Sequence, residues 1–513
     1  MASDLQTTIV MAMLLPLVGA IGVQLLGRFV NDNARDAWTV VIGLATFSQV
    51  VSLAAPVSEG ARPALALPEW MPGLGLGFEV EPLGLLFALV ASGLWILTSL
   101  YAFGYMRGHD EKDQTRFFTC FALAISAALG IAFAGDLVTL FLFYEILTFS
   151  TFPLVTHAGT EAAVKAGRVY LGILVSTSVL FLLLAILWTG NVADDLAFHG
   201  GVAGAAPAGL LDGRLDGRSA GLLLLLFAYG VGKAALMPFH RWLPAAMVAP
   251  TPVSALLHAV AVVKAGVFSV LKIAVYVFGI DMLSRDGLSD GLMWIAAFTI
   301  LAASIRALRL DGFKPRLAYS TISQLSYIVL GAALATGAAA MGAGLHILMH
   351  ALGKITLFFV AGAVYVVAHK DKVSQLDGLG RKMPWTFGAF CVASFSIIGL
   401  PPMGGAWSKW FLVTGAVEAG EPLMAFVFMT SSLLSIGYLM PIVVRAFFRE
   451  APALEPAEGE DHGHHAADHG EAPLLMLVPI CTTALLCFVV FFYTDAVYDL
   501  LAPVFGLAGG AGR

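Results

Sequence analysis

The sequence predicts an all-α polytopic membrane protein, and three observations lead to this fold class. Hydrophobic residues make up 59% of the 513 residues, and the mean hydropathy is +0.87. Only 12% of the residues are charged, whereas soluble globular proteins carry about 25%. Apolar runs of roughly 20 residues, the length that crosses a bilayer, recur along the whole chain. A soluble globular fold is therefore excluded, and the net charge of -6 gives no reason to expect a nucleic-acid partner.

About fourteen membrane spans are predicted from these apolar runs. The first is too long for the apolar core of a signal peptide, so we expect it to be a transmembrane helix. The predicted spans are 8–28, 36–55, 81–104, 116–134, 136–156, 169–190, 220–239, 252–279, 288–308, 314–336, 341–367, 384–417, 423–447 and 474–503.

Two of the spans contain helix-breaking sequences beside a lysine. Span seven carries Lys233 and then meets Pro238. In span twelve, Pro401 and Pro402 precede Lys409. Proline removes a backbone donor and clashes with the preceding helical turn, and in a membrane such a break persists only where protein or water satisfies the freed groups. Two discontinuous helices are therefore predicted. The alternative is a pair of proline kinks with no role in transport.

The broken spans lie five spans apart, which indicates an internal repeat. Spans four to eight and nine to thirteen would each have the broken helix in fourth place. An odd number of spans makes the two units inverted, and paired broken helices in inverted repeats point to a transport site. The predicted divisions are 1–115 (spans one to three), 116–279 (first repeat), 280–447 (second repeat) and 448–513 (a His-rich cytoplasmic loop and span fourteen).

The distribution of basic residues predicts the orientation. Loops after odd-numbered spans hold 18 of the 28 Lys and Arg residues, the opposite loops hold 5, and the remaining five are lysines within spans. Basic residues concentrate in cytoplasmic loops. Both termini are therefore expected on the outer face of the cell inner (plasma) membrane, as an even number of spans requires.

Glu145 is the one acidic side chain set deep in a long apolar span, and its own span carries no other charge. Burial disfavours an unpaired carboxylate, so a nearby ammonium is expected. Lys233, in the middle of span seven, is the natural partner. Such a pair has a closed arrangement and an open one, in which the lysine is released toward another site. The alternative is a static buried ion pair, which is weak evidence for stability.

Span eight carries His258 and Lys264. Six residues on a helix separate two side chains by about 120° around the axis and about 9 Å along it, so they face different neighbouring helices. A relay role is favoured over that of a packed core histidine. Lys272 lies nearer the outer end of the same span, and we expect its side chain to extend to the membrane interface.

Span eleven contains the sharpest local motif, a polar stripe formed by His346, His350 and Lys354. Their four-residue spacing places them on one face of a helix. Histidine titrates near neutral pH, which suits proton transfer. A zinc site is disfavoured because the glutamate of the H-E-x-x-H motif is missing.

Lys409 is the last buried charge, after the break in span twelve. The charged residues form a line from Glu145 to Lys409, expected to run parallel to the membrane plane because each lies near mid-depth of its span. Small polar residues that would bind water along it are Thr148, Ser254, Ser320, Thr321, Ser323, Gln324 and Ser326.

Other features carry little chemistry. The four cysteines lie in apolar runs without metal-ligand spacing, so neither disulfides nor a metal site are expected. The His-rich segment 461–469 is predicted to be a solvated cytoplasmic loop. No cofactor-binding motif and no catalytic site are found.

Several motifs, in order along the chain, resemble those of a known family, the antiporter-like subunits shared by respiratory complex I, membrane-bound hydrogenases and Mrp-type multisubunit Na⁺/H⁺ antiporters. They are Phe143-Tyr144-Glu145, the stretches 233–244, 250–258, 263–266 and 314–324, the stripe in span eleven, and Gly399-Leu400-Pro401-Pro402 up to Lys409.

The resemblance implies fourteen core helices with inverted repeats, and it implies roles for the buried charges. Glu145 and Lys233 would be the switchable pair of the first half-channel, and Lys264 with His258 would bridge the halves. The span-eleven stripe would be the central relay, and Lys409 the terminal lysine of the second half-channel.

The resemblance also implies partners and a function. The chain ends soon after span fourteen and carries lysine in span twelve, which leaves the D-type Mrp subunit as the closest resemblance. The expected function is a proton-translocating subunit of a multisubunit monovalent cation/H⁺ antiporter, with other integral membrane subunits as partners. The first alternative is a proton-pumping membrane subunit of a complex I-like NADH dehydrogenase or membrane-bound hydrogenase. Further alternatives are a subunit of an inorganic-carbon uptake complex and a largely structural subunit.

Overall fold

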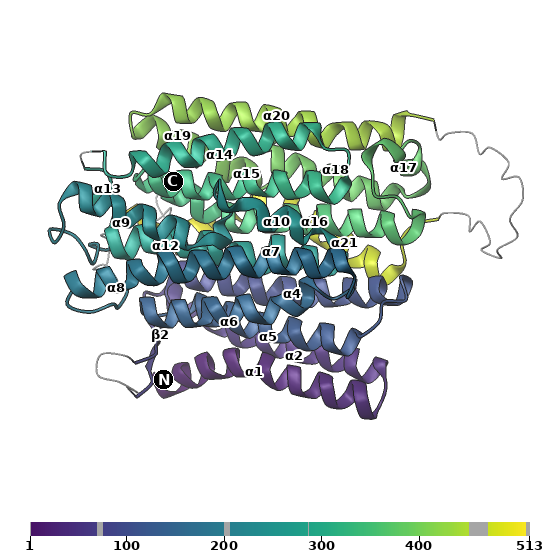
Figure 1. Ribbon diagram of the computed structural model, residues 1–513, viewed down its shortest axis with the longest axis horizontal. Coiled ribbons are helices and arrows are strands. Elements are labelled where there is room, and N and C mark those ends of the chain that lie inside the picture. Colours follow the sequence, from purple (N-terminus) through teal and green to yellow (C-terminus); the bar gives the residue numbers. More distant parts are fainter. Residues whose placement is uncertain (1, 69–74, 200–205, 286, 451–469, 509–513) are drawn as a thin grey trace, which may run out of the picture.

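Long helices lie side by side along one axis of the computed structural model (Figure 1). The structure describes residues 2–68, 75–199, 206–285, 287–450 and 470–508. Eleven of the described helices are long and apolar enough to cross a membrane. The prediction of an all-α polytopic membrane protein is thereby confirmed. The number of fourteen spans stays a prediction. The described helices at the two broken spans, Gly217–Gly230 and Pro384–Ile398, are shorter, and the helix of predicted span ten, Phe313–Ala333, is not among the eleven.

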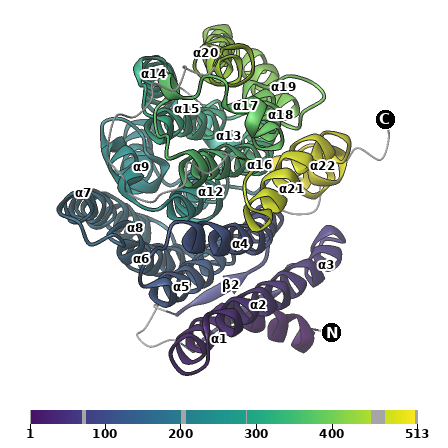
Figure 2. The same cartoon turned by 90° about the vertical axis from the view of Figure 1, so that its right-hand side faces the viewer.

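The N-terminal helices form one edge of the bundle (Figure 2). The Asn31 side chain accepts a hydrogen bond from Ala34 N and begins the second helix, and Glu81 caps the fourth in the same way. A two-stranded antiparallel hairpin separates the third and fourth helices. The elements are α1 (Ala2–Phe29), α2 (Asp32–Ser52), α3 (Ala54–Ser58), β1 (Ala64–Ala66), β2 (Gly77–Glu79) and α4 (Pro82–Gly108).

The region of the predicted first repeat contains several short helical pieces. Its elements are α5 (Gln114–Ala132), α6 (Leu137–Val155), α7 (Glu161–Thr177), η1 (Ser178–Leu182), α8 (Leu183–Val192), α9 (Gly217–Gly230), η2 (Gly232–Ala234), η3 (Phe239–Arg241), α10 (Trp242–Ala245), η4 (Ala246–Val248), α11 (Thr251–Ala255), η5 (Leu256–Val260), α12 (Val262–Ile273), η6 (Ala274–Phe278) and α13 (Ile280–Leu283).

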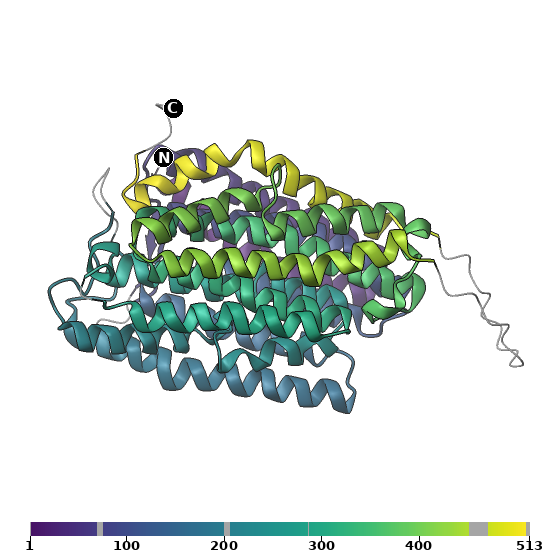
Figure 3. The same ribbon diagram turned by 90° about the horizontal axis from the view of Figure 1, so that it is seen from above.

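The C-terminal half follows with longer helices. Its elements are α14 (Asp290–Arg309), α15 (Phe313–Ala333), α16 (Gly337–Ala368), η7 (Val373–Gln375), α17 (Leu379–Lys382), α18 (Pro384–Ile398), α19 (Gly405–Glu418), α20 (Pro422–Phe448), α21 (Leu474–Phe492), α22 (Thr494–Leu501) and η8 (Ala502–Phe505). The beginning of α1 and the end of α22 lie toward the same end of the bundle (Figure 3).

The centre of the bundle is formed by α11 to α12 and by α16 (Figure 2). In the most apolar stretch of residues 251–278 every residue is buried, and in that of α16 83% are, against 33% for α1 and α21. These central helices also carry six of the nine buried lysines and histidines in the described chain, because there protein rather than lipid surrounds the helix on all sides.

Both predicted breaks are present. The first begins at Val231, directly after α9, so Lys233 lies within the break rather than before it. The sequence predicted the interruption at Pro238, which lies five residues after Lys233, between η2 and η3. Gly266 of α12 packs so closely on this segment that a Cβ there would come 2.4 Å from the carbonyl carbon of Lys233. The close packing of α12 therefore covers the broken backbone.

The second break separates α18 from α19 over residues 399–404, and Pro401 and Pro402 lie within it. Gly399 has a φ of +92°, a conformation that glycine adopts without strain. The divisions at 115, 279 and 447 and the inverted relation of the repeats stay predictions. The His-rich segment 461–469 lies outside the described residues.

Candidate functional site

One face of α16 forms the axis of the site. His346, His350 and Lys354 are all buried, and each follows the previous one by four residues. This spacing displaces successive side chains by about 6 Å along a helix, so the three extend over about 12 Å. The sequence predicted that the line of charged residues stays at one depth in the membrane. At α16 its members instead follow one another along the bundle axis.

His350 is the point where α12 meets α16. The Lys264 ammonium lies 2.5 Å from Nδ1 of His350 in hydrogen-bond geometry. His258, from η5, packs its ring on Phe358 with a centroid distance of 4.6 Å. Neither ring nitrogen of His258 has a hydrogen-bond partner in the described part of the chain. His258 and Lys264 thus contact different parts of α16 and not each other, as their six-residue spacing predicts.

His346 connects the stripe to the second broken helix. Its Nδ1 lies 2.9 Å from the Ser408 hydroxyl, which precedes Lys409 in α19. The Tyr327 ring stacks on His346 with a centroid distance of 5.5 Å. The rings of His346 and His350 are 5.7 Å apart, centroid to centroid. Buried polar groups therefore follow one another from Lys264 through the two histidines to the residue next to Lys409.

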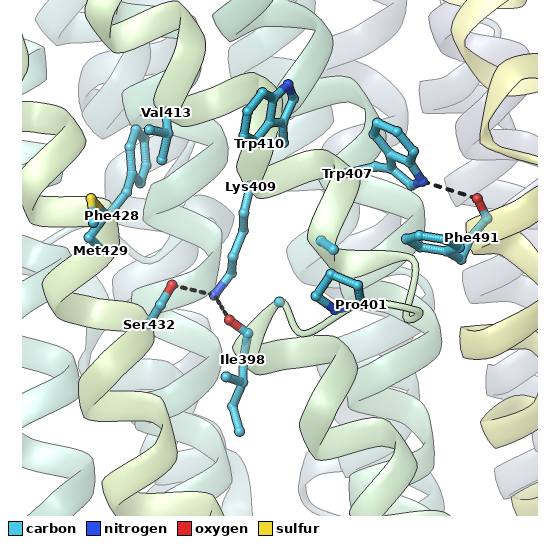
Figure 4. A pocket seen from close by; sticks show the side chains of 12 residues that line it. Ile398, Pro401, Trp407, Lys409, Trp410, Val413, Phe428, Met429, Ser432 and Phe491 are labelled. Carbon is cyan, nitrogen blue, oxygen red and sulfur yellow. Dashed lines mark hydrogen bonds between the residues drawn. The ribbon is translucent and has the colours of Figure 1, made fainter.

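Lys409 extends from α19 back to the break (Figure 4). Its ammonium donates to the Ile398 carbonyl at 3.0 Å and to the Ser432 hydroxyl at 2.8 Å. It lies 5.0 Å from the centre of the Tyr327 ring. A cavity of about 540 Å³, lined mainly by apolar residues that include Pro401 and two tryptophans, adjoins the lysine. The carbonyl freed by the break thus becomes a partner for Lys409.

Lys354 has a different partner, on α15. Its ammonium donates to the Ser320 hydroxyl at 2.5 Å. Ser320 in turn donates to the Tyr438 hydroxyl at 3.0 Å, and that hydroxyl is 2.8 Å from the Ser435 hydroxyl. This series of hydroxyls leads from the stripe into the interface between α15 and α20.

Lys233 lies against α6, beside Glu145. Its ammonium donates to the Tyr144 carbonyl at 2.8 Å and to the Thr148 hydroxyl at 2.6 Å, and it lies 3.1 Å from the centre of the Tyr144 ring. The Tyr144 hydroxyl accepts a hydrogen bond from Lys233 N at 3.0 Å. No described ion pair joins Lys233 to Glu145, and one Glu145 oxygen is buried without a hydrogen bond. Lys233 therefore contacts the neighbours of Glu145 on α6, and the switching of the pair stays a prediction.

Lys272 does not extend to the membrane interface, so that prediction is wrong. The side chain is buried, and its ammonium lies 3.3 Å from Glu81 Oε1. It also donates to the Ala134 carbonyl at 2.8 Å. Glu81, the N-cap of α4, accepts hydrogen bonds from Leu83 N and Gly84 N. A buried carboxylate holds the lysine inside the protein, which outweighs the gain from hydration at the interface.

Sequence reasoning missed Glu81, Tyr144, Tyr327, Tyr438, Ser408 and Ser432. A signal was available for three of them. Glu81 stands directly before Pro82, which is typical of a helix start. Tyr144 and Ser408 each stand next to a charged residue that the sequence analysis selected. Tyr327, Tyr438 and Ser432 are brought to the site only by tertiary packing.

The chain matches family models over most of its length. Residues 134–435 match the model described as "NADH:quinone oxidoreductase/Mrp antiporter, TM". Residues 70–118 match the model "NADH-Ubiquinone oxidoreductase (complex I), chain 5 N-terminus". Together the two matches include α4 and the helices from α6 to α19, and thus the buried charges described above.

Named relatives come from both branches of this family. The NADH-quinone oxidoreductase subunit N of Desulforudis audaxviator is 34% identical over 451 residues, which cover 86% of this chain and 87% of that protein. The Na(+)/H(+) antiporter subunit A1 of Staphylococcus haemolyticus is 30% identical over 459 residues, which cover 84% of this chain and 53% of that protein.

Two solved structures share the fold. A chain of the Mrp complex from Dietzia sp. DQ12-45-1b superposes with a TM-score of 0.80 at 21% identity, over 96% of each chain. A chain of the membrane-bound sulfane sulfur reductase, an archaeal respiratory membrane complex, gives a TM-score of 0.83 at 22% identity, over 97% of this chain and 98% of that one. From the family-model match and the identity to these relatives, the chain belongs to the NADH:quinone oxidoreductase/Mrp antiporter transmembrane family of antiporter-like subunits.

Proposed function

We propose that the protein is a proton-translocating subunit of a multisubunit monovalent cation/H⁺ antiporter. The observation that carries this proposal is a series of buried polar groups from three helices, Lys264, His350, His346, Ser408 and Lys409. A 2.5 Å contact joins Lys264 to His350, a 2.9 Å contact joins His346 to the Ser408 hydroxyl, and Lys409 follows Ser408 in the chain. Burial of so many titratable groups without carboxylate partners is costly in a membrane, and such groups mark proton or ion pathways.

The mechanism that we propose starts at Glu145 and Lys233. When the pair closes, Lys233 leaves Tyr144 and Thr148, and its charge is stabilised by the carboxylate. When the pair opens, the ammonium is released from the carboxylate toward another site. An approaching like charge disfavours protonation of the next site, so Lys264 passes its proton to His350, and the disturbance continues through the stripe to Lys409.

The partners and the orientation are part of the same proposal. Other integral membrane subunits would complete the complex, and protons and a monovalent cation would be the transported ions. The protein would lie in the cell inner (plasma) membrane with both termini on the outer face. The excess of basic residues in the loops after odd-numbered spans supports this orientation.

A second candidate is a proton-pumping membrane subunit of a redox complex. The observation that favours it is the relative named NADH-quinone oxidoreductase subunit N, of which the match covers 87%, against 53% for the relative named as an antiporter subunit. In that case the redox cofactors would belong to partner subunits.

The composition of the native complex distinguishes these candidates. The protein is purified from its own membrane in mild detergent, and its partners are identified by mass spectrometry. Several membrane subunits without cofactor proteins would support the antiporter. Co-purified flavin or iron–sulfur subunits, with transport that requires an electron donor, would replace it with the redox-driven pump.

A Lys233→Ala variant of the same complex tests translocation itself. We expect the complex to assemble and proton transport in proteoliposomes to be lost. Normal transport by this variant would contradict the proposed mechanism, and normal transport by the Lys233→Ala/Lys409→Ala double variant would leave only a structural role.

A further inference from the structure

Gln324 is a buried polar side chain to which the mechanism above gives no task. It lies in the middle of α15 and is fully buried. The Tyr327 hydroxyl lies close enough to interact weakly with the Gln324 amide, but neither the amide nitrogen nor the amide oxygen has a described protein partner in full hydrogen-bond geometry. An amide offers two donors and two acceptor lone pairs. A buried amide that used none of them would be strongly destabilising, so a partner is required.

The packing of α15 on α16 shows where Gln324 faces. These helices are consecutive and antiparallel (Figure 1). Ser320 of α15 contacts Lys354, and Tyr327 contacts His346. Gln324 lies between Ser320 and Tyr327, four residues after one and three before the other, on the same face of the helix.

On α16, His350 lies midway between the two contacted residues, Lys354 and His346. Because the helices are antiparallel, Gln324 is opposite the turn that carries His350. The two contacts on either side fix this register.

A second buried polar group without a described hydrogen-bond partner, the Nε2 atom of His350, lies on the facing helix. Nδ1 of His350 faces Lys264, whereas its Nε2 is buried and makes no hydrogen bond to the described protein. Buried water commonly bridges polar groups that protein atoms leave unsatisfied, and it makes about three hydrogen bonds. We propose that Gln324 is a positioning residue that holds a water molecule against Nε2 of His350 and so orients the imidazole for proton exchange with Lys264.

The proton balance follows from the two nitrogens of the ring. The Lys264 ammonium transfers a proton to Nδ1 of His350, which breaks an N–H bond on the lysine and forms one on the ring. The imidazolium then gives its Nε2 proton to the bound water. The water stays neutral because it gives at the same time one of its own protons toward His346, the next base of the stripe, whose Nε2 has no hydrogen bond in the described protein. Lys264 ends as a neutral amine, and His350 ends neutral with its proton on the other nitrogen. Gln324 accepts from and donates to the water and does not change its own charge.

This inference rests on the proposed function, and a nearly isosteric variant tests it. Gln324→Met keeps the length of the side chain and removes the amide. The control is Thr98→Val, because Thr98 is equally buried on α4 and its hydroxyl bonds the Leu94 carbonyl within that helix. Both variants are assayed in the intact native complex in proteoliposomes, for proton transport and for a buried-water O–H band by infrared difference spectroscopy with H₂¹⁸O.

We expect Gln324→Met to assemble, to lose the water band and to transport protons roughly tenfold more slowly, as for a lost catalytic hydrogen bond. Thr98→Val is expected to keep both. A water band and a transport rate like those of the wild type in Gln324→Met would overturn the inference. If Gln324→Met does not assemble, Gln324→Asn, which keeps the amide, replaces it. If Gln324→Asn retains the water band and most of the proton-transport rate, the inference is supported. If Gln324→Asn loses both, the inference is overturned.

A Lys264→Met variant distinguishes failure of the inference about Gln324 from failure of the proposed function. If Lys264→Met is inactive and Gln324→Met is normal, only the inference about Gln324 fails. If Lys264→Met itself transports normally, the proposed function fails and the inference with it.

Discussion

The five buried lysines occupy two kinds of surroundings, and both kinds occur on α12. Near the end of that helix, Lys272 has the Glu81 carboxylate, the Ala134 carbonyl and three aromatic rings around its ammonium. Eight residues earlier, Lys264 has only the imidazole of His350. Lys233, Lys354 and Lys409 likewise have hydroxyl or carbonyl oxygens and no carboxylate within ion-pair distance in the described chain.

These two kinds of surroundings distinguish a lysine with a fixed charge from lysines that exchange protons. A carboxylate and aromatic faces bind an ammonium specifically, so the surroundings of Lys272 suit a structural ion pair. Neutral partners hydrogen-bond to the lysine in either protonation state. The four lysines with neutral partners are therefore suited to carry protons, whereas Lys272 with Glu81 connects α4 to α12. Four predictions, from the largest expected effect to the smallest, test this distinction.

Lys354→Met is expected to have the largest effect on transport. Lys354 is the end of the polar stripe and the start of the hydroxyl series through Ser320. Its removal deletes a proton-transfer group, which typically contributes about 10²–10⁴-fold to a rate. Proton uptake by proteoliposomes that contain the variant complex measures the effect. A transport rate within about threefold of wild type would show that Lys354 is not part of the proton pathway.

Lys272→Met is expected to affect stability instead. It leaves Glu81 as an uncompensated buried charge, which costs about 3–5 kcal/mol. Glu81→Gln/Lys272→Met removes both charges and is expected to recover most of that loss. Thermal unfolding of the detergent-solubilised complex, followed by size-exclusion chromatography, compares the two variants. A double variant as unstable as the single one would show that the ion pair is not the cause.

Ser408→Ala is expected to have a moderate effect on the rate. It removes the hydroxyl that hydrogen-bonds His346, a loss of about 1 kcal/mol, which corresponds to a roughly fivefold slower transport. Ser92→Ala is the matched control, because Ser92 is equally buried and bonds the Ala88 carbonyl of its own helix. Equal rates for the two variants would mean that the contact with His346 has no part in transport.

Glu79→Gln is expected to have the smallest effect. Glu79 pairs with Arg62 at 3.4 Å, and the two side chains are 25% and 30% exposed. Solvent-exposed ion pairs contribute less than about 1 kcal/mol, and this pair touches none of the neutral-partner lysines. Stability and transport are both expected to stay near wild type. A loss of stability as large as that of Lys272→Met would show that Glu79 contributes to the buried Glu81–Lys272 ion pair.

The sequence was sufficient for the fold class, for both helix breaks and for four of the five buried lysines, because charge in an apolar span is conspicuous. It was also sufficient for the polar stripe of α16, since helical spacing alone places those residues on one face. It did not predict the Lys272 partner, because Glu81 lies almost two hundred residues away in the chain. Nor did it place the start of the first break, which depends on how closely Gly266 lets α12 approach.

The most direct test of the distinction between fixed and exchangeable lysines is proton transport by Glu81→Gln/Lys272→Met beside Lys264→Met, each in the intact native complex at matched amounts of assembled protein. The two lysines lie on the same helix, and both are fully buried. The expected result is transport close to wild type for the double variant and none for Lys264→Met. Equal loss of transport in both would contradict the distinction.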